Sequence, residues 1–429
     1  MMAAISIEGF LTWIYDVPIE SLILFLFFPI IIEFSRYFGK VIFLGIYNLQ
    51  NSKNKFEKPL LPPILKPKIT IMIPAHNEEY GIQKSIESVI NNEYTNKEII
   101  VIDDGSTDNT YEIAKKYHDK GLIKIVHRDD ASGSKAQALN YGSMYATGSI
   151  ILVIDGDSQL DKYSLNEAAK CFHEDKDISA ISGNLKVLTG DDGVKNILTK
   201  MQDYEFLTSV DLARRFTTVF NIIMVISGAI GAFRKDVFEM VGKYDVDTIG
   251  EDFDLTLKIN KLGKIIKFSH KTSIHFYCPN NIRALIQQRI RWSHAQIQTL
   301  LKHKDVLWKS KYRTGFRLAI MDMWIMDVLI NFAWIGSISL LVGFLLISQF
   351  HELEFIAIDE IIYLSILIFP IYFISELIQF LYAIHVSGRK QSLSLIWLIP
   401  LMIFVYRPLI RIITIRGHIG ALLGSKISW

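Results

Sequence analysis

Two carboxylates, Asp155 and Asp157, flank Gly156 directly after the wholly apolar run 150–154. Like charges so close repel one another strongly unless a cation lies between them. Mg²⁺ and Mn²⁺ are hard ions that bind one or two carboxylates together with substrate phosphates. The downstream ligands of an EF-hand are missing. The sequence therefore predicts a divalent-metal site at this pair.

A second acidic pair, Asp103 and Asp104, ends the run 98–102 and precedes a glycine that permits a tight turn. Ser106 or Thr107 is expected to cap a helix that begins at residue 108. Both carboxylates are then left without a capping role, and one of them is expected to accept hydrogen bonds from a base or ribose. A capped turn with solvated acids is the alternative.

The first apolar run, 69–73, ends in Pro74 and Ala75, and Pro74 cannot continue a strand ladder. Asn77, together with Glu78 and Glu79, is expected to cap the following helix. The amides of that helix N-terminus favour an anionic or polar ligand. Capping alone is the simpler interpretation of this cluster.

A glycine-containing turn, Ser132 to Ser134, precedes Lys135 at the expected start of a helix. Backbone amides and a lysine at such a place suit phosphate oxygens. The turn lacks the Walker A spacing and is therefore not a P-loop. A solvated lysine is the alternative.

Two further motifs occur after residue 249. Glu251 and Asp252 follow Gly250, and one of these acids is expected to act as a general base if it is buried near the reacting centre. N-capping of a helix by Asp252 explains the same pattern equally well.

Gln288, Arg291 and Trp292 share one helix face at i, i+3 and i+4. Gln288 supplies an amide, Arg291 a guanidinium that can bind a diphosphate, and Trp292 an aromatic ring on which a sugar ring can stack. The alternative is an interfacial amphipathic helix, because the same stretch contains other basic residues. These are Arg283, Arg289, Lys302 and Lys304.

The elements that would position these residues alternate between short β-branched runs and amphipathic stretches. Strict alternation predicts right-handed crossovers and a mainly parallel sheet, in which ligands lie at the carboxyl ends of the strands. The predicted strands are 69–73, 98–102, 122–126, 150–154, 178–187, 225–233 and 265–268, and the predicted helices are 78–91, 108–118, 135–146 and 165–173.

Composition places this domain between membrane segments. The 429 residues have a mean hydropathy of +0.26, too high for an ordinary soluble protein of this size. Their 46 Lys and Arg against 44 Asp and Glu leave a net charge of +2, which argues against nucleic acid as a partner. The two cysteines, Cys171 and Cys278, exclude a disulfide framework.

The apolar segments lie at both ends of the chain. Residues 21–49 are expected to form an uncleaved anchor, either one tilted helix in which Glu33 and Arg36 offset each other or a hairpin. Residues 324–347 and 361–384 are each long enough to cross a bilayer. For 393–406 a re-entrant or interfacial segment is preferred, and a crossing that includes the arginines after it is the alternative.

The distribution of charge predicts the orientation. Lys53, Lys55 and Lys58 follow the first anchor, and Arg389 and Lys390 lie in the last loop, so both regions are expected in the cytosol. The loop 349–360 has four acids and no Lys or Arg and is expected outside. We therefore expect a multi-pass protein of the plasma membrane with a cytosolic central domain.

In this order, Asp104, Asp155-Gly156-Asp157, Glu251-Asp252 and Gln288-x-x-Arg291-Trp292 resemble the D, DxD, ED and QxxRW motifs of processive family 2 glycosyltransferases. That family includes cellulose, chitin, hyaluronan and poly-N-acetylglucosamine synthases. The resemblance is strong over residues 59–301 and looser over the flanking helices and the tail 406–429. Four ordered motifs are far more specific than any one of them.

The resemblance implies an α/β domain of the GT-A fold that inverts the anomeric centre of a UDP-sugar. In this family Asp104 would contact uracil, Lys135 the diphosphate, and Asp155 the nucleotide sugar. Asp157, with Asp155, would bind Mg²⁺ or Mn²⁺. Asp252, accompanied by Glu251, would be the general base.

The remaining positions are assigned by the same resemblance. Gln288, Arg291 and Trp292 would hold the diphosphate and the terminal sugar of the acceptor, whereas Ser227 and Gly228 would lie on the acceptor side. The sequence departs from the family pattern at Gly250, where threonine is usual, and we expect no regulatory domain after the last helices. The other expected substrate-binding residues are Pro74, Ala75, Asn77 and Glu78.

Four regions follow: an anchor at 1–58, a GT-A catalytic domain at 59–280, interfacial amphipathic helices at 281–323, and transmembrane helices with a basic tail at 324–429. The expected function is transfer of N-acetylglucosamine from a UDP-sugar to a growing extracellular polysaccharide, in a lipid bilayer and with a small membrane partner protein. One alternative is the transfer of a single sugar to a membrane lipid. Another is a non-catalytic membrane scaffold that binds a nucleotide.

Overall fold

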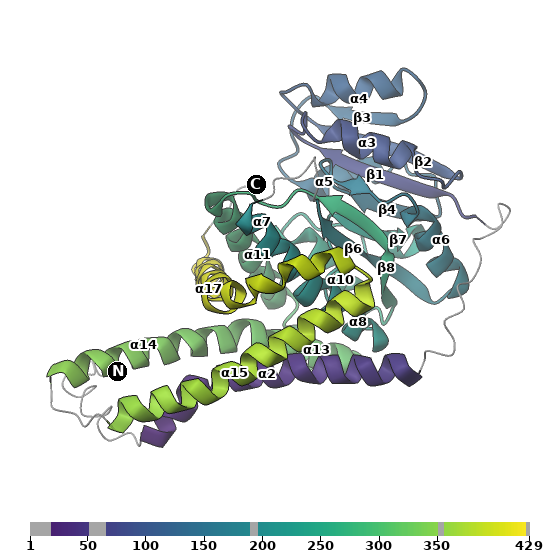
Figure 1. Cartoon of the computed structure of the whole chain (residues 1–429). Helices are drawn as coiled ribbons and strands as arrows, with labels where there is room; N and C mark the ends of the chain where they lie inside the picture. The colour runs from purple at the N-terminus through teal and green to yellow at the C-terminus, as the bar shows by residue number, and fades with distance from the viewer. Residues whose placement is uncertain (1–18, 51–65, 189–195, 351–355, 426–429) are drawn as a thin grey trace.

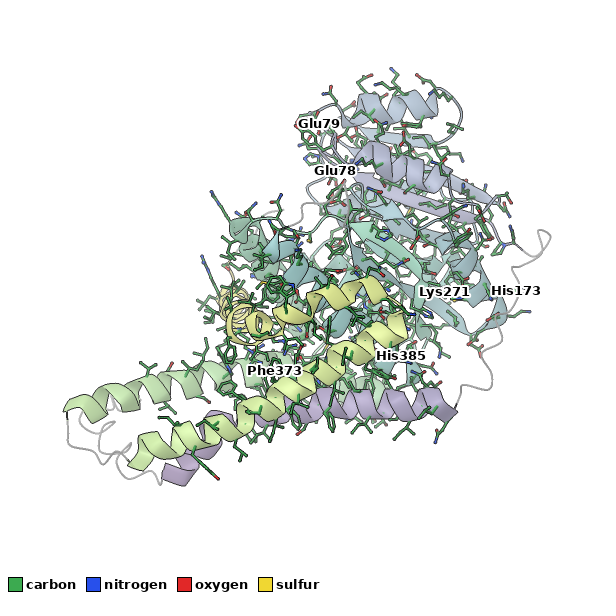
Figure 2. All side chains as sticks on the ribbon, in the orientation of Figure 1. Glu78, Glu79, His173, Lys271, Phe373 and His385 are labelled. Atoms are coloured by element: carbon green, nitrogen blue, oxygen red, sulfur yellow. The ribbon has the colours of Figure 1, made fainter. Side chains whose placement is uncertain are left out.

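The computed structural model describes residues 19–50, 66–188, 196–350 and 356–425. A sheet domain lies on one side of the molecule, and the long helices α2 (Ile19–Gln50), α14 (Ile330–Phe350) and α15 (Ile356–Ser387) lie together on the other (Figure 1). Glu78 lies in the sheet domain, well apart from Phe373 on α15 (Figure 2). Several positions used for the predicted topology are outside the described residues: Lys53, Lys55, Lys58, the boundary at 58/59 and part of the loop 349–360.

An eight-stranded sheet in the order β3-β2-β1-β4-β7-β6-β8-β5 forms the centre of the described domain. Six of these strands run in one direction, so the predicted mainly parallel sheet is confirmed. The strands are β1 (Ile69–Ala75), β2 (Lys97–Asp104), β3 (Lys124–Arg128), β4 (Ile150–Ile154), β5 (Gln159–Leu160), β6 (Ile178–Val187), β7 (Ile230–Arg234) and β8 (Ile265–Phe276).

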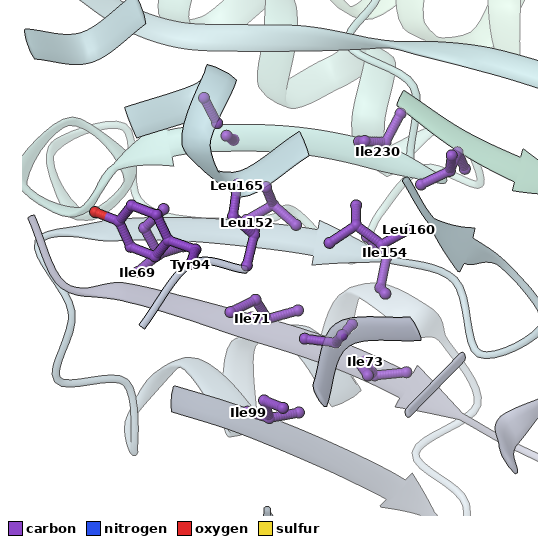
Figure 3. Packing of buried hydrophobic residues seen from close by; sticks show 14 of the residues in the cluster. Ile69, Ile71, Ile73, Tyr94, Ile99, Leu152, Ile154, Leu160, Leu165 and Ile230 are labelled. Atoms are coloured by element: carbon purple, nitrogen blue, oxygen red, sulfur yellow. The ribbon is translucent and has the colours of Figure 1, made fainter. Parts of the chain in front are cut away.

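The central strands β1 and β4 are buried along their whole length because both faces of the sheet are covered. Successive side chains point to opposite faces, so Ile71 and Leu152 enter one core while Met72 and Val153 enter the other. Figure 3 shows Ile71, Leu152 and their neighbours packed in the first of these cores.

The parallel direction predicted from the alternation of strands and helices fails at β7, which runs antiparallel between β4 and β6 although helices precede and follow it. The predicted strand 225–233 was also too long, because residues 225–229 form a loop before Ile230. A strand buried on both faces shows the same apolar pattern in either direction, so the sequence did not reveal the reversal. The short edge strand β5 was not predicted, and β8 extends eight residues beyond the predicted 265–268.

The helices that follow the strands differ from the predictions mainly at their starts. The expected caps were wrong at two of them: Gly81, not Asn77, precedes α3, and Asp108, not Ser106 or Thr107, accepts from the Thr110 N–H at the start of α4. The helices are α3 (Ile82–Ile90), α4 (Thr110–His118), α5 (Lys135–Ser143), α6 (Ser164–Glu174), α9 (Lys235–Met240) and α10 (Glu251–Lys261).

A second group of helices links the sheet to the apolar segments. They are α7 (Ile197–Glu205), η3 (Phe206–Asp211), α8 (Leu212–Val219), α11 (Ile282–Lys302), α12 (Asp305–Trp308), α13 (Thr314–Met323) and η4 (Trp324–Leu329). The last helical run consists of η5 (Lys390–Leu398), α16 (Ile399–Leu401), η6 (Met402–Tyr406) and α17 (Arg407–Leu422).

Three helical runs in the described residues are long and apolar enough to cross a membrane, namely Thr314–Leu340, Ile366–Ser387 and Lys390–Leu422. The anchor is one helix, α2, rather than a hairpin. The preference for a re-entrant last segment depended on the short apolar run 393–406 and on the arginines after residue 406. The run continues through them to Leu422, while α17 packs against α11.

The charged residues of these helices find partners far along the chain. Glu33 and Arg36 were expected to offset each other, but Glu33 pairs with Arg411 and Arg36 with Asp322. The Arg407 guanidinium donates to Glu376 at 2.7 Å. Isolated charges are costly in a bilayer, and these contacts neutralise them between helices.

Candidate active site

The loops after β1 and β4 meet closely at the carboxyl end of the sheet. A β-carbon at Gly81 would lie 2.7 Å from the Asp157 Cα, and one at Gly156 would lie 3.1 Å from the Pro74 carbonyl oxygen and 3.2 Å from the Glu78 Cγ. A side chain at residue 81 would therefore force the backbone to shift, and one at residue 156 would fit only tightly. The structure brings Pro74, Glu78 and Asp157 together at this edge of the sheet.

This approach concentrates negative charge. Burial, followed by repulsion from Asp157 and Asp155, raises the pKa of Glu78 to about 7. Burial and the Asp155 carboxylate raise the pKa of Asp157 to about 6. Carboxylates that resist ionisation in this way favour a cation beside them.

The residues present fit a divalent ion that is completed by a substrate. Within the described residues no group of three or more His, Cys, Asp or Glu side chains forms a self-contained metal site. Mg²⁺ and Mn²⁺ commonly take one or two carboxylates and fill their remaining positions with phosphate and water. Asp157 and Asp155 match that donor set.

Lys135 is the first residue of α5, as predicted, and Ser134 caps this helix by accepting from the Gln137 N–H. The ammonium group contacts the Asp155 carboxylate and donates to the Gly228 carbonyl oxygen at 3.0 Å. Burial opposes its charge, but the surrounding carboxylates, of which Asp155 has the largest effect, raise the pKa of Lys135. The alternative of a solvated lysine is wrong.

Asp252 lies directly beside Lys135. Its Oδ2 accepts from the Gly228 N–H at 2.7 Å, and its Oδ1 accepts from the Phe253 N–H at 2.7 Å. Gly250 occupies the N-cap of α10, so Asp252 is not the N-cap residue. A β-carbon at Gly228 would lie 3.3 Å from both the Asp252 Oδ2 and the Lys135 Nζ, which explains why a glycine occupies this position.

Glu251 adds a second acid at the same place. Burial, followed by the negative charge of Asp252, raises the pKa of Glu251 to about 7. The Glu251 carboxyl is therefore buried beside Asp252 and exchanges its proton readily near neutral pH.

Asp104 has a supporting role that the sequence did not reveal. Its carboxylate accepts from the Ser132 N–H at 3.0 Å and the Ser132 hydroxyl at 2.6 Å, and the Arg128 Nε lies 3.2 Å away. Asp103 is wholly buried and contacts His127 at 2.7 Å. The alternative of solvated acids is wrong, because Asp104 connects β2 to the turn that precedes Lys135.

Three predicted residues lie at the edge of this arrangement. The Asn77 Oδ1 accepts from the Thr107 N–H at 2.8 Å and thus joins the turns after β1 and β2. Ala75 is buried in β1 beside Asp103. The Ser227 Oγ accepts from the Ala229 N–H at 3.3 Å and shapes the turn before β7.

The helix α11 contacts the Glu251 loop from the opposite side. A β-carbon at Gly250 would lie 3.0 Å from the Ala295 Cβ and 3.3 Å from the Thr299 hydroxyl. Arg291 and Gln288 lie one and two turns before Ala295 on the same face of the helix. Ala295 and Thr299 of α11 thus lie against the Gly250 turn that precedes the two acids, and Gly250 allows α11 to approach.

Two buried residues near Asp252 were missed by sequence reasoning. Burial lowers the pKa of Arg214 to about 10 against the opposing effect of the Asp252 and Asp211 carboxylates. Burial and the charge of Glu251 raise the pKa of Tyr244. No short motif surrounds either residue, and the only signal was a pair of arginines on a helix of otherwise mixed character.

The close contact of Gly81 with the backbone at Asp157 makes a direct prediction. Gly81→Ala should displace the Asp157 loop and lower transferase activity by about 10²-fold, because small displacements of reacting groups carry large kinetic costs. Activity and far-UV circular dichroism should be measured on the same preparation. Wild-type activity in the variant would show that the two loops tolerate separation.

Comparison with known proteins identifies the domain. Residues 70–242 match the sequence profile described as Glycosyl transferase family 2. Poly-β-1,6-N-acetyl-D-glucosamine synthase of Staphylococcus aureus is 28% identical over 309 residues, which cover 71% of this chain and 73% of the relative. The protein of the same name from Staphylococcus epidermidis is 27% identical over 378 residues, covering 83% of this chain and 86% of the relative.

A solved structure shows the same fold. A mannosyltransferase from Pyrobaculum calidifontis, in complex with GDP-mannose and Mn²⁺, superimposes with a TM-score of 0.61 over 95% of this chain and all of its own, at 16% identity. The predicted GT-A fold is thereby confirmed. Residues 70–242 form a family 2 glycosyl transferase domain, in a chain that is homologous to the staphylococcal poly-N-acetylglucosamine synthases.

Proposed function

We propose that this protein is a membrane-embedded inverting glycosyltransferase that adds N-acetylglucosamine from UDP-N-acetylglucosamine to a growing extracellular polysaccharide. The observation that carries the proposal is the direct contact of Lys135, Asp155, Gly228 and Asp252 at the carboxyl end of the sheet. The homology to poly-β-1,6-N-acetyl-D-glucosamine synthases supports the choice of sugar and product.

In the proposed mechanism, the Asp252 carboxylate takes the proton of the acceptor hydroxyl as that oxygen attacks C1 of the donor sugar. The Gly228 N–H holds the Oδ2 of Asp252 in place, so the base is oriented before the acceptor arrives. Attack from the side opposite the leaving group inverts the anomeric centre. The departing UDP takes the electron pair of the broken bond.

Positive charge must offset the charge that develops on the diphosphate. Lys135, buried and held near Asp155, supplies one fixed charge, and Arg291 on α11 is proposed to supply another. A Mg²⁺ or Mn²⁺ ion held by Asp157 and Asp155 would neutralise further charge on the leaving group. Asp104 is proposed to contact the uracil from the turn that it shares with Ser132.

The membrane part is proposed to hold the enzyme with its catalytic domain in the cytosol of a plasma-membrane protein. Three apolar helical runs and the anchor α2 support a multi-pass arrangement. The basic Arg389 and Lys390 precede the last run on the side that faces the sheet domain, where Arg389 donates to Asp203 at 2.7 Å. This placement agrees with the preference for positive charge on the cytosolic side.

The raised pKa values predict how a cation affects stability. Without a cation, the protonated Asp157 and Glu78 carboxyls favour the folded state. This stabilisation is lost as the pH rises through the pKa of Asp157, about 6, and that of Glu78, about 7, because the ionised carboxylates are destabilised in their buried site. A cation binds the ionised form, so its affinity should rise over the same interval.

We therefore expect Mn²⁺ to raise the Tm more at about pH 7.5 than at about pH 5.5, because protons compete with the ion for these carboxylates at the lower pH. Differential scanning fluorimetry with and without MnCl₂ at both values would measure this. An equal rise at the two pH values would contradict a cation bound by Asp157.

A screen of labelled UDP-sugars tests the donor assignment. The purified protein in lipid nanodiscs should release UDP from UDP-N-acetylglucosamine faster than from UDP-glucose, UDP-galactose or UDP-glucuronate. Faster release from another donor would overturn the sugar assignment, and no release from any of them would favour a non-catalytic scaffold.

A further inference from the structure

A trio of buried polar side chains connects three elements beside Trp292. Glu205 ends α7, Arg289 lies in α11, and Tyr406 ends η6. The Arg289 Nη2 donates to the Glu205 Oε2 at 2.6 Å, and the Tyr406 hydroxyl donates to the same oxygen at 2.7 Å. These residues are separated by more than 80 positions along the chain, and we call them the Glu205 trio.

The trio is linked to Trp292 through Arg289. The Arg289 guanidinium lies 4.5 Å from the centroid of the Trp292 ring. Arg289 is only 8% exposed, whereas Trp292 is 41% exposed although the guanidinium lies against it. Arg289, one of the basic residues on which the alternative of an interfacial amphipathic helix depended, is therefore buried within the protein.

A guanidinium fixed at this distance restricts the ring. A partly exposed aromatic side chain ordinarily moves between rotamers, and a cation held against its ring by a charge-assisted hydrogen bond to Glu205 disfavours such movement. The exposed part of Trp292 is then a rigid plate on which a sugar ring can stack. Rigidity lowers the entropy that acceptor binding must overcome.

We infer that Glu205 and Tyr406 are positioning residues for the acceptor sugar, acting through Arg289 on the Trp292 ring. This inference deepens the proposed function, because it rests on the acceptor side of the same site. Tyr406 belongs to the last helical run, so the trio also fixes the acceptor platform relative to the apolar helices.

The chain offers a matched control within the same helix. Asp203 lies two residues before Glu205 in α7 and accepts from the Arg389 guanidinium at 2.7 and 2.8 Å. This pair connects the same α7 to the start of the last helical run and is similarly buried. In the described part of the chain, the Arg389 guanidinium is not stacked on an aromatic ring. Asp203→Asn therefore removes a comparable contact without affecting Trp292.

The test measures two dissociation constants by titration calorimetry on the detergent-solubilised full chain. The probes are a β-1,6-linked N-acetylglucosamine pentasaccharide for the acceptor side and UDP-N-acetylglucosamine with MnCl₂ for the donor side. Glu205→Gln should weaken pentasaccharide binding about tenfold, the effect of losing one charge-assisted hydrogen bond, and leave donor binding unchanged. Asp203→Asn should lower the Tm but leave both constants unchanged.

A double-mutant cycle separates positioning from general destabilisation. If the trio acts as one unit, Glu205→Gln combined with Tyr406→Phe should bind the pentasaccharide no more weakly than Glu205→Gln alone. Equal pentasaccharide affinity in Glu205→Gln and the wild type would overturn the inference, as would an equal loss in Asp203→Asn. These binding measurements do not depend on turnover. A wild-type protein that binds the pentasaccharide but transfers no sugar would refute the proposed function, whereas the pentasaccharide affinities of the variants would still test this inference.

Discussion

Asp252→Asn should abolish polymer formation while the protein still binds UDP-N-acetylglucosamine. Asparagine has nearly the same shape and can still accept from the Gly228 N–H, so the local structure should persist. It cannot take a proton from the acceptor hydroxyl. Loss of a general base typically lowers the rate by about 10²- to 10⁴-fold, and we expect the upper end because Asp252 is the base in the proposed mechanism.

Glu251→Gln is the appropriate comparison for Asp252→Asn. Both acids are at the start of α10, and Glu251 is the more deeply buried, with its pKa raised to about 7. Its substitution removes a neighbouring negative charge without removing the base, so the activity should fall less. UDP release with a pentasaccharide acceptor measures both variants. Greater activity in Asp252→Asn than in Glu251→Gln would exchange the roles of the two acids.

Asp157→Asn should eliminate the effect of Mn²⁺ on stability, because the ion would lose its main protein ligand. The transfer rate should fall by about 10²-fold or more, because no ion would then offset the negative charge on the leaving UDP. The same variant should be more stable than the wild type when no metal is present. The wild-type Asp157 carboxylate is buried beside Asp155, and removing its charge relieves that repulsion.

Asp161→Asn provides the control for this second prediction. Asp161 lies four residues further along the chain and accepts from Lys186 at 2.7 Å and from the Ser273 hydroxyl at 2.7 Å. It should lose some stability and keep its response to Mn²⁺. Melting curves with and without MnCl₂, with turnover measured in parallel, distinguish the variants. A normal Mn²⁺ response in Asp157→Asn would show that the ion binds elsewhere.

The local features of the site were predictable because short-range chemistry determines them. The runs 150–154 and 178–187 match β4 and β6 residue for residue. A short apolar stretch with polar flanks, such as 150–154, is typical of a buried strand. Lys135 begins α5 as expected, because a serine cap and a glycine turn precede it. The position of Asp157 just after β4 followed from the same reasoning.

Contacts between distant segments were not predictable in this way. Glu33 and Arg36 form a plausible i, i+3 pair on α2, yet each contacts a residue more than 280 positions away. In the sequence, Arg289 is one of several basic residues near Arg291, and nothing in this pattern indicates that it is buried. Its burial depends on contacts with Glu205 of α7 and Tyr406 of η6. The direction of β7 likewise depends on sheet order, which apolar periodicity does not encode.

The most direct test of the proposed polymerase is the length of its product under limiting turnover. The protein in lipid nanodiscs would receive labelled UDP-N-acetylglucosamine and Mn²⁺, and the reaction would be stopped while most donor is still unreacted. The proposed function predicts long chains of N-acetylglucosamine at this early time, beside unused acceptor. A product that carries only one added sugar, on a lipid or an oligosaccharide, would contradict it.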